Sequence, residues 1–341
     1  MKAVVIRNQG KGVEAWKLVE RPEPKPGPGQ VLLRVRAASL NYRDYMIAKG
    51  VYAGPLGQDI VPLADGAGEI VALGEGVHQW KVGDRVASTY FQTWQDGPMR
   101  PEYFDHQLGA KSNDGVLAEY AVLSENGVVR IPDYLSFEEA ATLPCAALTA
   151  YTAIFESAEH FRPGGSILVQ GTGGVSLFAA QLARAHGLRV LATTSSAAKA
   201  ARLKELGAEV VVNYRDVPEW QTEILRATNG EGVDQVLEVG GGGTLKRSFE
   251  AVKFGGLVSV IGLLTGVGPE VDPLPILFKA LHVEGVIVGS RHAFQRMNRA
   301  LERFQIHPIV DEVFPLSRAS DALAKLERGA HFGKIVIRVD S

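Results

Sequence analysis

The stretch from Ser166 to Gly187, SILVQGTGGVSLFAAQLARAHG, constrains the fold of this chain more than any other. It begins with a short apolar run of the kind that is buried on both faces of a parallel sheet. The turn GTGGV follows, and apolar residues at helical spacing then continue to Gly187, a residue type that often ends helices. The stretch therefore predicts a strand, a tight turn and an amphipathic helix in immediate succession.

A turn of this kind suits a dinucleotide. Glycines without a Cβ can take positive φ and let a diphosphate approach the backbone, and the positive end of the next helix dipole favours the same anion. The usual pattern Gly-x-Gly-x-x-Gly ends in a third glycine, where this chain has Ser176, which is small enough to keep helix and strand close. The candidate pyrophosphate site comprises Gly171, Thr172, Gly173, Gly174 and Val175.

The residues after the turn alternate between strand-like and helix-like segments, which adds specificity to a motif that is common by itself. The predicted strands are 189–193, 209–213, 233–239, 257–262 and 282–288, and the predicted helices between them include 197–206 and 244–254. Six strands alternating with helices are typical of a doubly wound parallel sheet, that is, a Rossmann domain of the α/β class. We expect the last strand, near 281–289, to form an edge of that sheet.

Length and composition exclude several classes of protein. A chain of 341 residues favours two domains, and 46% hydrophobic with 22% charged residues is ordinary for a soluble globular protein. The net charge of -2 gives no attraction to nucleic acid or to an anionic membrane. One cysteine excludes a disulfide framework within the chain. The first residues run straight into strand-like sequence and no apolar run reaches membrane-spanning length, so we expect a cytoplasmic protein.

Residues 1 to about 125 differ in kind from the middle of the chain. They consist of short β-rich segments separated by proline and glycine, with predicted strands at 1–6, 31–39 and 117–123 and two more within 65–86. A loop-rich segment at 89–114 carries several aromatic residues between 90 and 103, which either line a binding site or form ordinary loop packing.

Several ordered motifs resemble the medium-chain dehydrogenase/reductase family, and in particular its zinc-free quinone oxidoreductase-like branch. The motifs are GAGEIVALGEGV, WKVGDRV, LPCAALTAY, GTGGVS and the closing GKIVI. The resemblance implies a GroES-like β-barrel catalytic domain at 1–125, a Rossmann dinucleotide-binding domain at 126–289, and a return to the catalytic domain at 290–341. It also implies that the nicotinamide lies in the cleft between the domains and that the protein is a homodimer.

The resemblance raises the question of a metal. Zinc-dependent relatives use a cysteine, a His-Glu pair and a second cysteine for catalytic zinc, which needs three such ligands and an open position. The matching places here carry Asn41, then Ala64 and Asp65, and finally Cys145. One good ligand does not hold catalytic zinc, so we predict no metal site. Cys145 is interpreted as a small buried residue, with a reactive thiol as the alternative.

The predicted cofactor is NADP, used as NADPH. A turn that prefers NAD usually places an acidic residue at the end of the second strand, whereas this strand ends in TTSS at 193–196. A 2′-phosphate could instead meet Ser195, Lys199 and Arg202, and by resemblance Tyr214. The alternative is that Lys199 and Arg202 form only the solvated face of a helix. Further contacts are expected from Thr194 at the strand end and, by resemblance, from Thr149, Val239, Gly240 and Gly262, with Arg291 and Lys334 as additional phosphate candidates.

The segment LNYRDYMIAKGVY, residues 40–52, matches the active-site segment of the family. By resemblance, Asn41 and Tyr52 fall on positions that zinc-free relatives use near the substrate carbonyl, while Tyr42 and Asp44 could equally be structural. Without a Lewis acid, a carbonyl must be polarised by hydrogen-bond donors placed where negative charge develops. The hypothesis is therefore hydride transfer from NADPH to a quinone or an α,β-unsaturated carbonyl, with Asn41 holding the oxygen and Tyr52 or water supplying a proton.

Two other functions stay open at this stage. The first is an NADP-dependent alcohol dehydrogenase, which the lost zinc ligands disfavour. The second is a non-catalytic regulatory protein that binds NADPH, since a fold does not guarantee chemistry.

Overall fold

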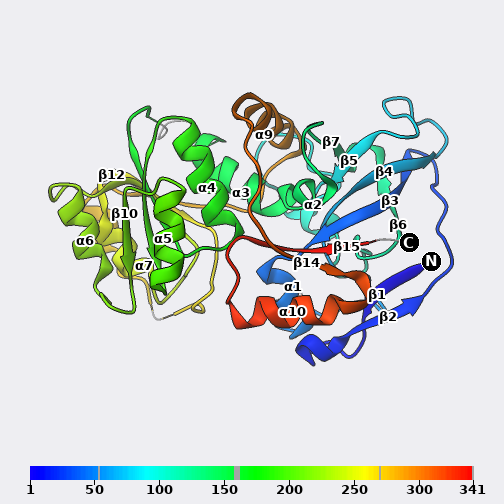
Figure 1. Cartoon of the computed structure of the whole chain (residues 1–341), viewed down its shortest axis with the longest axis horizontal. Coiled ribbons are helices and arrows are strands. Elements are labelled where there is room, and N and C mark those ends of the chain that lie inside the picture. Colours follow the sequence, from blue (N-terminus) through cyan, green and yellow to red (C-terminus); the bar gives the residue numbers. More distant parts are fainter. Residues whose placement is uncertain (53, 157–161, 269, 340–341) are drawn as a thin grey trace. The chain divides into compact units, whose positions relative to one another are not determined.

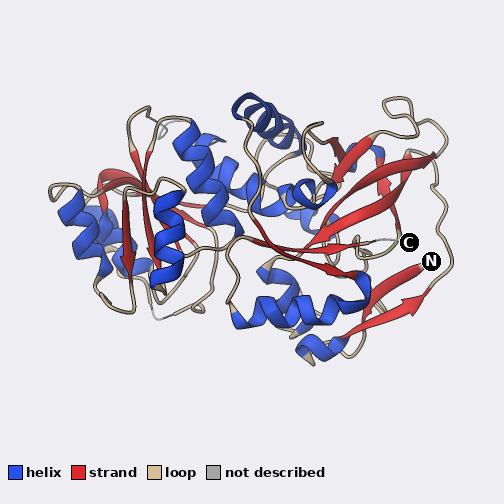
Figure 2. Ribbon diagram, in the orientation of Figure 1, coloured by secondary structure: helices blue, strands red, loops and turns tan. Residues whose placement is uncertain are grey.

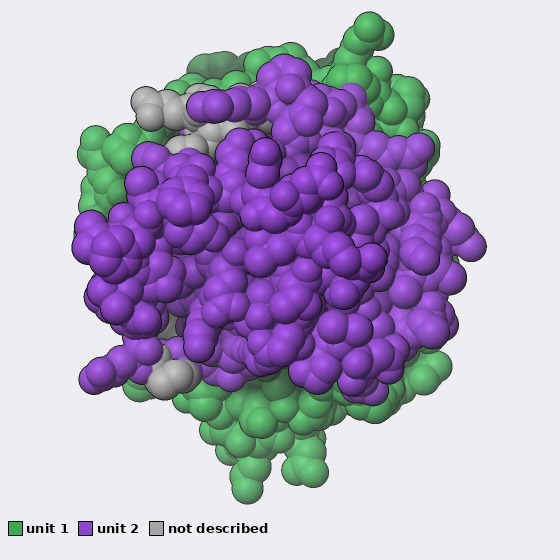
Figure 3. All heavy atoms as spheres, turned by 90° about the vertical axis from the view of Figure 1, so that its left-hand side faces the viewer, with its two compact units in different colours: residues 1–148, 288–341 green, residues 149–287 purple. Residues whose placement is uncertain are grey.

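The computed structural model describes residues 1–52, 54–156, 162–268 and 270–339, which Figure 1 and Figure 2 show as ribbons. The chain divides into two compact units, residues 1–148 with 288–341 and residues 149–287, which have different colours in Figure 3. The second unit is shorter than the predicted 126–289, because residues 126–148 pack with the first unit. There β7 (Val128–Arg130) pairs antiparallel with β5 (Arg85–Ser88) and extends the sheet of the first unit.

The second unit contains a six-stranded sheet in which every neighbouring pair is parallel, in the order β10-β9-β8-β11-β12-β13. This order reverses direction between β8 and β11, the arrangement of a doubly wound sheet. The prediction that the last strand lies at an edge is confirmed. The strands are β8 (Ser166–Gln170), β9 (Arg189–Thr194), β10 (Val210–Asn213), β11 (Val233–Glu238), β12 (Val252–Val260) and β13 (His282–Gly285).

Helices cover this sheet and explain its apolar strands. All five residues of β8 are buried, as expected for a strand that is covered on both faces. Trp220 and Ile224 of α6 and Phe249 of α7 pack into one core with Leu168 and Val236 of the sheet. The helices are α4 (Gly174–Ala185), α5 (Ala197–Glu205), α6 (Trp220–Ala227), α7 (Leu245–Ala251) and α8 (Leu274–Phe278), with α3 (Leu148–Tyr151) at the start of the unit and the π-helical turn Thr152–Glu156 after it.

The first unit contains a seven-stranded sheet, ordered β14-β15-β3-β4-β5-β7 with β6 also paired to β3, and a separate two-stranded sheet (Figure 1). Its long strand β3 alternates between buried and half-buried residues in its middle, as the sequence predicts. The remaining strands are β1 (Lys2–Ile6), β2 (Trp16–Glu20), β3 (Gln30–Ser39), β4 (Asp65–Leu73), β6 (Tyr120–Ser124), β14 (Val310–Pro315) and β15 (Lys334–Arg338). Its helices are α1 (Tyr42–Ala48), α2 (Phe137–Ala140), α9 (Arg291–Phe304) and α10 (Ala319–Arg328), with shorter turns at Gly12–Ala15, Pro101–His106, Glu125–Gly127, Leu143–Ala147 and Leu316–Arg318.

Four predicted elements have wrong boundaries. The strand predicted at 257–262 begins at Val252 and ends at Val260. The helix predicted at 244–254 ends at Ala251, because Val252 already pairs with Val233 at the start of β12. The strand predicted at 282–288 ends at Gly285, and the one predicted at 117–123 begins at Tyr120. In each case long-range strand pairing, which local spacing does not show, decides where the element begins or ends. No helix within the described residues is long and apolar enough to cross a membrane.

Candidate active site

The predicted pyrophosphate turn has the geometry that its sequence requires. Gly171 takes a φ of +72°, and Gly173 is the N-cap of α4. No atom lies within 4 Å of a Cβ built on either residue, so the space over this backbone is open to a ligand. Ser176, at the third glycine position, donates its hydroxyl to the carbonyl of Gln170 at 2.7 Å and so fixes helix to strand. These residues fit a diphosphate at the N-terminus of α4.

The predicted 2′-phosphate residues follow the ends of two neighbouring strands. Asn213 of β10 is in register with Thr194 of β9, and the Tyr214 amide donates to the Thr194 carbonyl at 2.9 Å. Thr194 Oγ1 is buried and has no hydrogen-bond partner among the described residues. Ser195 and Lys199 are half-buried, and Tyr214 is 42% exposed. Because β9 and β10 are parallel neighbours, the loops that follow them lie at the same, carboxyl end of the sheet.

A second glycine turn follows β11 and is organised by Glu238, which is completely buried. One carboxylate oxygen accepts from the amides of Gly240 and Gly241 at 2.7 and 2.8 Å and from the Thr244 hydroxyl at 2.6 Å. The other oxygen accepts from Gln170 Nε2 at 2.8 Å and from the Ser248 hydroxyl. The carboxylate thus holds the turn that contains two of the predicted cofactor contacts, Val239 and Gly240. Sequence reasoning did not single out this residue.

Gly262, the third predicted contact of this group, lies directly against the same turn. Its amide donates to the Glu238 carbonyl at 3.2 Å, and a Cβ on it would lie 2.6 Å from the Val239 carbonyl oxygen. A side chain does not fit there, so glycine is required by the close approach of two backbones. Thr149, the contact predicted for the carboxamide, is buried in α3.

In the first unit, Asn41 is the N-cap of α1, directly after β3. The backbone N–H of Asn41 donates to the Asp44 carboxylate at 2.8 Å, and the backbone N–H of Asp44 donates to the backbone carbonyl of Asn41 at 2.9 Å. Asp44 is buried and forms an ion pair with Arg43 at 3.2 Å. Of the two roles considered for Asp44, structural and chemical, these contacts favour the structural one, because they fix the start of α1, where Asn41 is the N-cap.

The side chain of Asn41 has an unexpected neighbour, Lys334. The ammonium of this buried lysine donates to Asn41 Oδ1 at 2.6 Å and to the Leu40 carbonyl. It lies 4.0 Å from the carboxylate of Asp65, which is completely buried and accepts from the Cys145 amide at 3.3 Å. Asn41 Nδ2 and Asp65 Oδ1 are both buried and make no close hydrogen bond among the described residues, but the Asn41 side chain interacts with the Asp65 carboxylate and opposes the rise of its pKa.

The other predicted residues of the first unit have varied surroundings. Tyr52 is half-buried and interacts electrostatically with Arg43 and Tyr90. The Arg291 guanidinium donates to the Val128 carbonyl at 3.1 Å and to Gln79 Oε1 at 3.4 Å. Arg291 and Lys334 were both predicted to contact a cofactor phosphate, and in this structure both donate to groups of the protein. Their phosphate role stays a prediction.

The aromatic residues between 90 and 103 pack on one another. Phe91 meets the rings of Tyr90 and Trp94, and Trp94 stacks on Tyr103 with 5.8 Å between ring centroids. Arg43 lies 4.4 Å over the ring of Tyr90. Of the two predicted roles, these contacts favour internal packing beside α1.

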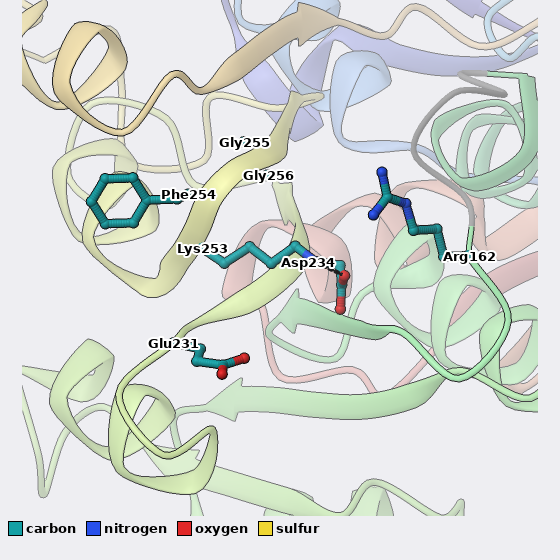
Figure 4. Close-up of a pocket in the computed structure, with 7 residues that line it drawn as sticks. All are labelled: Arg162, Glu231, Asp234, Lys253, Phe254, Gly255 and Gly256. Carbon is teal, nitrogen blue, oxygen red and sulfur yellow. Dashed lines mark hydrogen bonds and ion pairs between the residues drawn. The ribbon is translucent and has the colours of Figure 1, made fainter.

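A separate cavity of about 420 Å³ lies elsewhere in the second unit (Figure 4). Asp234, which follows the first residue of β11, forms an ion pair there with Lys253 and accepts from the Ser166 amide at 2.7 Å. The cavity therefore lies at the amino ends of β8 and β11, whereas the glycine turns follow their carboxyl ends. Ligands of open α/β sheets bind at the carboxyl ends, so we do not assign the cofactor to this cavity.

Comparison with known proteins agrees with this architecture. Residues 27–133 match the model of the alcohol dehydrogenase GroES-like domain, and residues 174–303 match that of zinc-binding dehydrogenases. A zinc-type alcohol dehydrogenase-like protein of Schizosaccharomyces pombe is 41% identical, over 98% of this chain and 99% of its own. The chain belongs to the medium-chain dehydrogenase/reductase family.

Solved structures of this family differ in cofactor. An NAD-dependent alcohol dehydrogenase has a TM-score of 0.90 and 33% identity, with 100% of both chains covered. The Escherichia coli quinone oxidoreductase complexed with NADPH has a TM-score of 0.84 and 25% identity, covering 99% of this chain and 100% of its own. The chain is thus an oxidoreductase of the family, and the second structure supports NADP binding. The relatives alone do not decide between the two dinucleotides.

The residues at the zinc-ligand places of the family do not fit a zinc ion in this chain. Ala64 has no donor atom, and Asn41 Oδ1 already accepts from an ammonium. Burial, with the charge of Asp65, raises the pKa of the Cys145 thiol to about 12, whereas zinc binds thiolate. No group of three His, Cys, Asp or Glu side chains suited to a metal occurs among the described residues.

The Asp65 carboxyl predicts a pH dependence of stability. Burial raises its pKa from the ordinary 3.8 to about 6, against the opposing charge of Lys334. Between these values the folded protein keeps a proton that the unfolded chain has released, so the stabilisation is complete below pH 3.8 and is lost as pH rises through 6. The free energy of unfolding of wild type minus that of Asp65→Asn is expected to fall by about 2 to 3 kcal/mol from pH 4 to pH 7. Urea denaturation of both proteins across this range measures it, and a constant difference would show that Asp65 titrates normally.

Proposed function

We propose that this protein is an NADPH-dependent reductase of quinones or α,β-unsaturated carbonyl compounds that works without zinc. The observation that carries the proposal is the environment of Asn41. Its Oδ1 accepts from Lys334 in a donor set that suits no zinc ion, and its buried Nδ2 makes no close hydrogen bond among the described residues, although the side chain interacts with the Asp65 carboxylate. The Asn41 NH2 group has two N–H donors, so one of them remains for a substrate oxygen even when the other interacts with Asp65.

The chemistry assigned to the chain's own residues is electrostatic. Asn41 Nδ2 donates to the substrate oxygen, on which negative charge develops as the neighbouring carbon system is reduced. Tyr52 or a water molecule supplies the proton that completes the reduction. Bound NADPH would supply the hydride, and the residues that fit its phosphates are the Gly171–Val175 turn and the loops after β9 and β10. An isolated Asn amide can do this only if water is kept away from the oxygen, because water would compete for the same hydrogen bond.

The preference for NADPH rests on the loop after β9. It contains no acidic residue to accept from ribose hydroxyls, while Ser195 and Lys199 are half-buried beside it and Tyr214 follows the neighbouring strand. A 2′-phosphate brings extra negative charge that the Lys199 ammonium would stabilise.

We expect Lys199→Ala to raise the KM for NADPH by about 10-fold while changing the KM for NADH less than twofold, since only NADPH carries the 2′-phosphate. Lys204→Ala, on the same helix, is the matched control and should leave both KM values unchanged. Equal weakening of both dinucleotides by Lys199→Ala would remove Lys199 from the phosphate site.

The function is tested by NADPH oxidation with chelator-treated protein whose zinc content has been measured. A 1,4-quinone, a simple enone and a saturated ketone are offered separately, and a primary alcohol is offered with NADP in the reverse direction. Turnover of the quinone or the enone supports the proposal. The second candidate, an alcohol dehydrogenase, is favoured by the names of two relatives. It predicts alcohol oxidation that disappears on chelation.

We also propose that two copies of the chain pair through the second unit. The edge strand β13 has no neighbour on its outer side in the described sheet, and Val283 on it is 42% exposed. Leu277 and Phe278 of the preceding helix α8 are 70% and 72% exposed. A second copy, related by a two-fold axis, would satisfy the strand ladder and cover these side chains at once.

Phe278→Asp is therefore expected to shift the protein from dimer to monomer at micromolar concentration, because it places a charge in an apolar interface. Light scattering coupled to size-exclusion chromatography measures the mass. Val82→Asp, at a 60% exposed position of the first unit, should remain dimeric. A monomeric wild type would contradict the proposal directly.

A further inference from the structure

Lys334 is a buried cation that has no role in the reaction described so far. Its side chain is 4% exposed, and it is the first residue of β15. That strand pairs antiparallel with β3 (Figure 1), and the Leu40 amide donates to the Ile335 carbonyl at 3.1 Å. The pairing places the Lys334 ammonium beside the residue that follows β3 and Leu40, which is Asn41.

The contact between Lys334 and Asn41 settles which way the amide faces. An ammonium has donors only, so the atom of Asn41 that lies 2.6 Å from it must be the oxygen. Because Oδ1 is held in this way, Nδ2 is the group that remains to face an acceptor. It is buried and makes no close hydrogen bond among the described residues; the side chain interacts with Asp65, which leaves at least one of its two N–H groups for a substrate oxygen.

The charge of Lys334 also changes what Asn41 can do. A cation at the amide oxygen draws electron density toward that oxygen, which makes the N–H groups stronger donors. The Asp65 carboxylate lies 4.0 Å from the ammonium, and its negative charge lowers the free-energy cost of burying Lys334. Arg43 and Asp44 nearby form their own pair at 3.2 Å.

We propose that Lys334 is a positioning residue: through its hydrogen bond to Oδ1 it orients and polarises the Asn41 amide, so that Nδ2 donates to the substrate oxygen. This inference rests on the proposed function and assigns its electrophilic donor. The alternative is that Lys334 binds a cofactor phosphate. Loss of the ammonium would lower kcat if Lys334 positions Asn41, and would weaken NADPH binding if Lys334 binds the phosphate.

The decisive variants are Lys334→Met, which keeps length and removes charge, and Lys334→Arg, which keeps charge. Lys334→Met is expected to lower kcat with an enone by about 10- to 100-fold and to leave the Kd for NADPH within twofold. Lys334→Arg should recover part of kcat. Lys325→Met is the matched control, because Lys325 is a largely buried lysine of the same unit that pairs with Asp311 and Glu312. Its kcat should equal that of wild type.

A double-mutant comparison separates positioning from independent action. If Lys334 acts through Asn41, Lys334→Met has no further effect on kcat in an Asn41→Ala background. The proposal would be overturned if the double variant lost kcat by the product of the two single effects. It would also be overturned if Lys334→Met alone raised the Kd for NADPH more than 10-fold. If Lys334→Met does not fold, Lys334→Met with Asp65→Asn removes both buried charges and allows the same comparison.

A second readout does not depend on turnover. In protein labelled with ¹⁵N-asparagine, the side-chain amide signal of Asn41 is identified by its loss in Asn41→Asp. Lys334→Met should shift that signal, and Lys325→Met should not. An unshifted signal contradicts the inference even if the enzyme is active, and a shifted signal in a protein that reduces no acceptor contradicts only the proposed function.

Discussion

Glu238→Ala is expected to lower the free energy of unfolding by about 3 to 5 kcal/mol and to abolish NADPH binding, because it leaves a set of buried donors without their acceptor. Those donors are the amides of Gly240 and Gly241, the hydroxyls of Thr244 and Ser248, and the Gln170 amide. The turn that they fix contains the predicted contacts to the ribose and nicotinamide. Chemical denaturation measures the stability, and fluorescence titration measures the NADPH affinity.

Glu209→Ala is the control for this prediction. Glu209 is also an acidic residue of the second unit, but it pairs with Arg189 at the surface, where both side chains are 44% to 50% exposed. Removing such a pair is expected to cost less than about 1 kcal/mol and to leave NADPH binding unchanged. Similar losses for the two variants would show that the Glu238 network has no special role in the cofactor turn.

Asn41→Ala is expected to lower kcat with a quinone or an enone by about 100- to 1,000-fold, the loss typical of one donor to a developing oxyanion. The Kd for NADPH should stay within twofold, because the predicted cofactor turns belong to the second unit. Steady-state kinetics and a separate binding titration measure the two quantities. The substitution also removes the acceptor of Lys334, so thermal unfolding must show that the variant is folded.

Asn126→Ala gives the comparison for this variant, since Asn126 is an exposed asparagine of the same unit. Its kcat should equal that of wild type. An Asn41→Ala variant with normal kcat would mean that another donor holds the substrate oxygen, and the proposed role of Asn41 would be wrong.

Much of the fold could be predicted because its signals are local. The run Ile167 to Val169, the turn at Gly171 and the helical spacing after it specify a strand, a turn and a helix within one short stretch. The alternation of such elements then specifies the parallel sheet. The end of the helix at Ala251 could not be predicted in this way, because the pairing of Val252 with Val233 is a contact between distant segments.

The site was predictable only in part, for the same physical reason. Asn41 and the glycine turns lie in recognisable motifs, but the partner of Asn41 lies 293 residues away, on the other side of the second unit in the chain. The spacing of residues does not show that β15 pairs with β3, so the sequence alone predicts a contact of Lys334 with a cofactor phosphate and not with Asn41. The sequence does contain a signal for Glu238. It is an acidic residue at the end of an apolar strand, followed by Val239 and then by four glycines, and burying such a carboxylate is costly unless backbone amides surround it.

The central claim, hydride transfer to a conjugated carbonyl with Asn41 as the donor to its oxygen, is tested most directly by the position of a deuterium label. Chelator-treated protein is mixed with NADPH deuterated at the transferring position and with an enone, and the product is examined by mass spectrometry and NMR. We predict a saturated ketone with deuterium on the carbon β to the carbonyl, formed by wild type and lost in Asn41→Ala. An alcohol with deuterium on the carbonyl carbon, or no labelled product despite NADPH binding, would contradict the account.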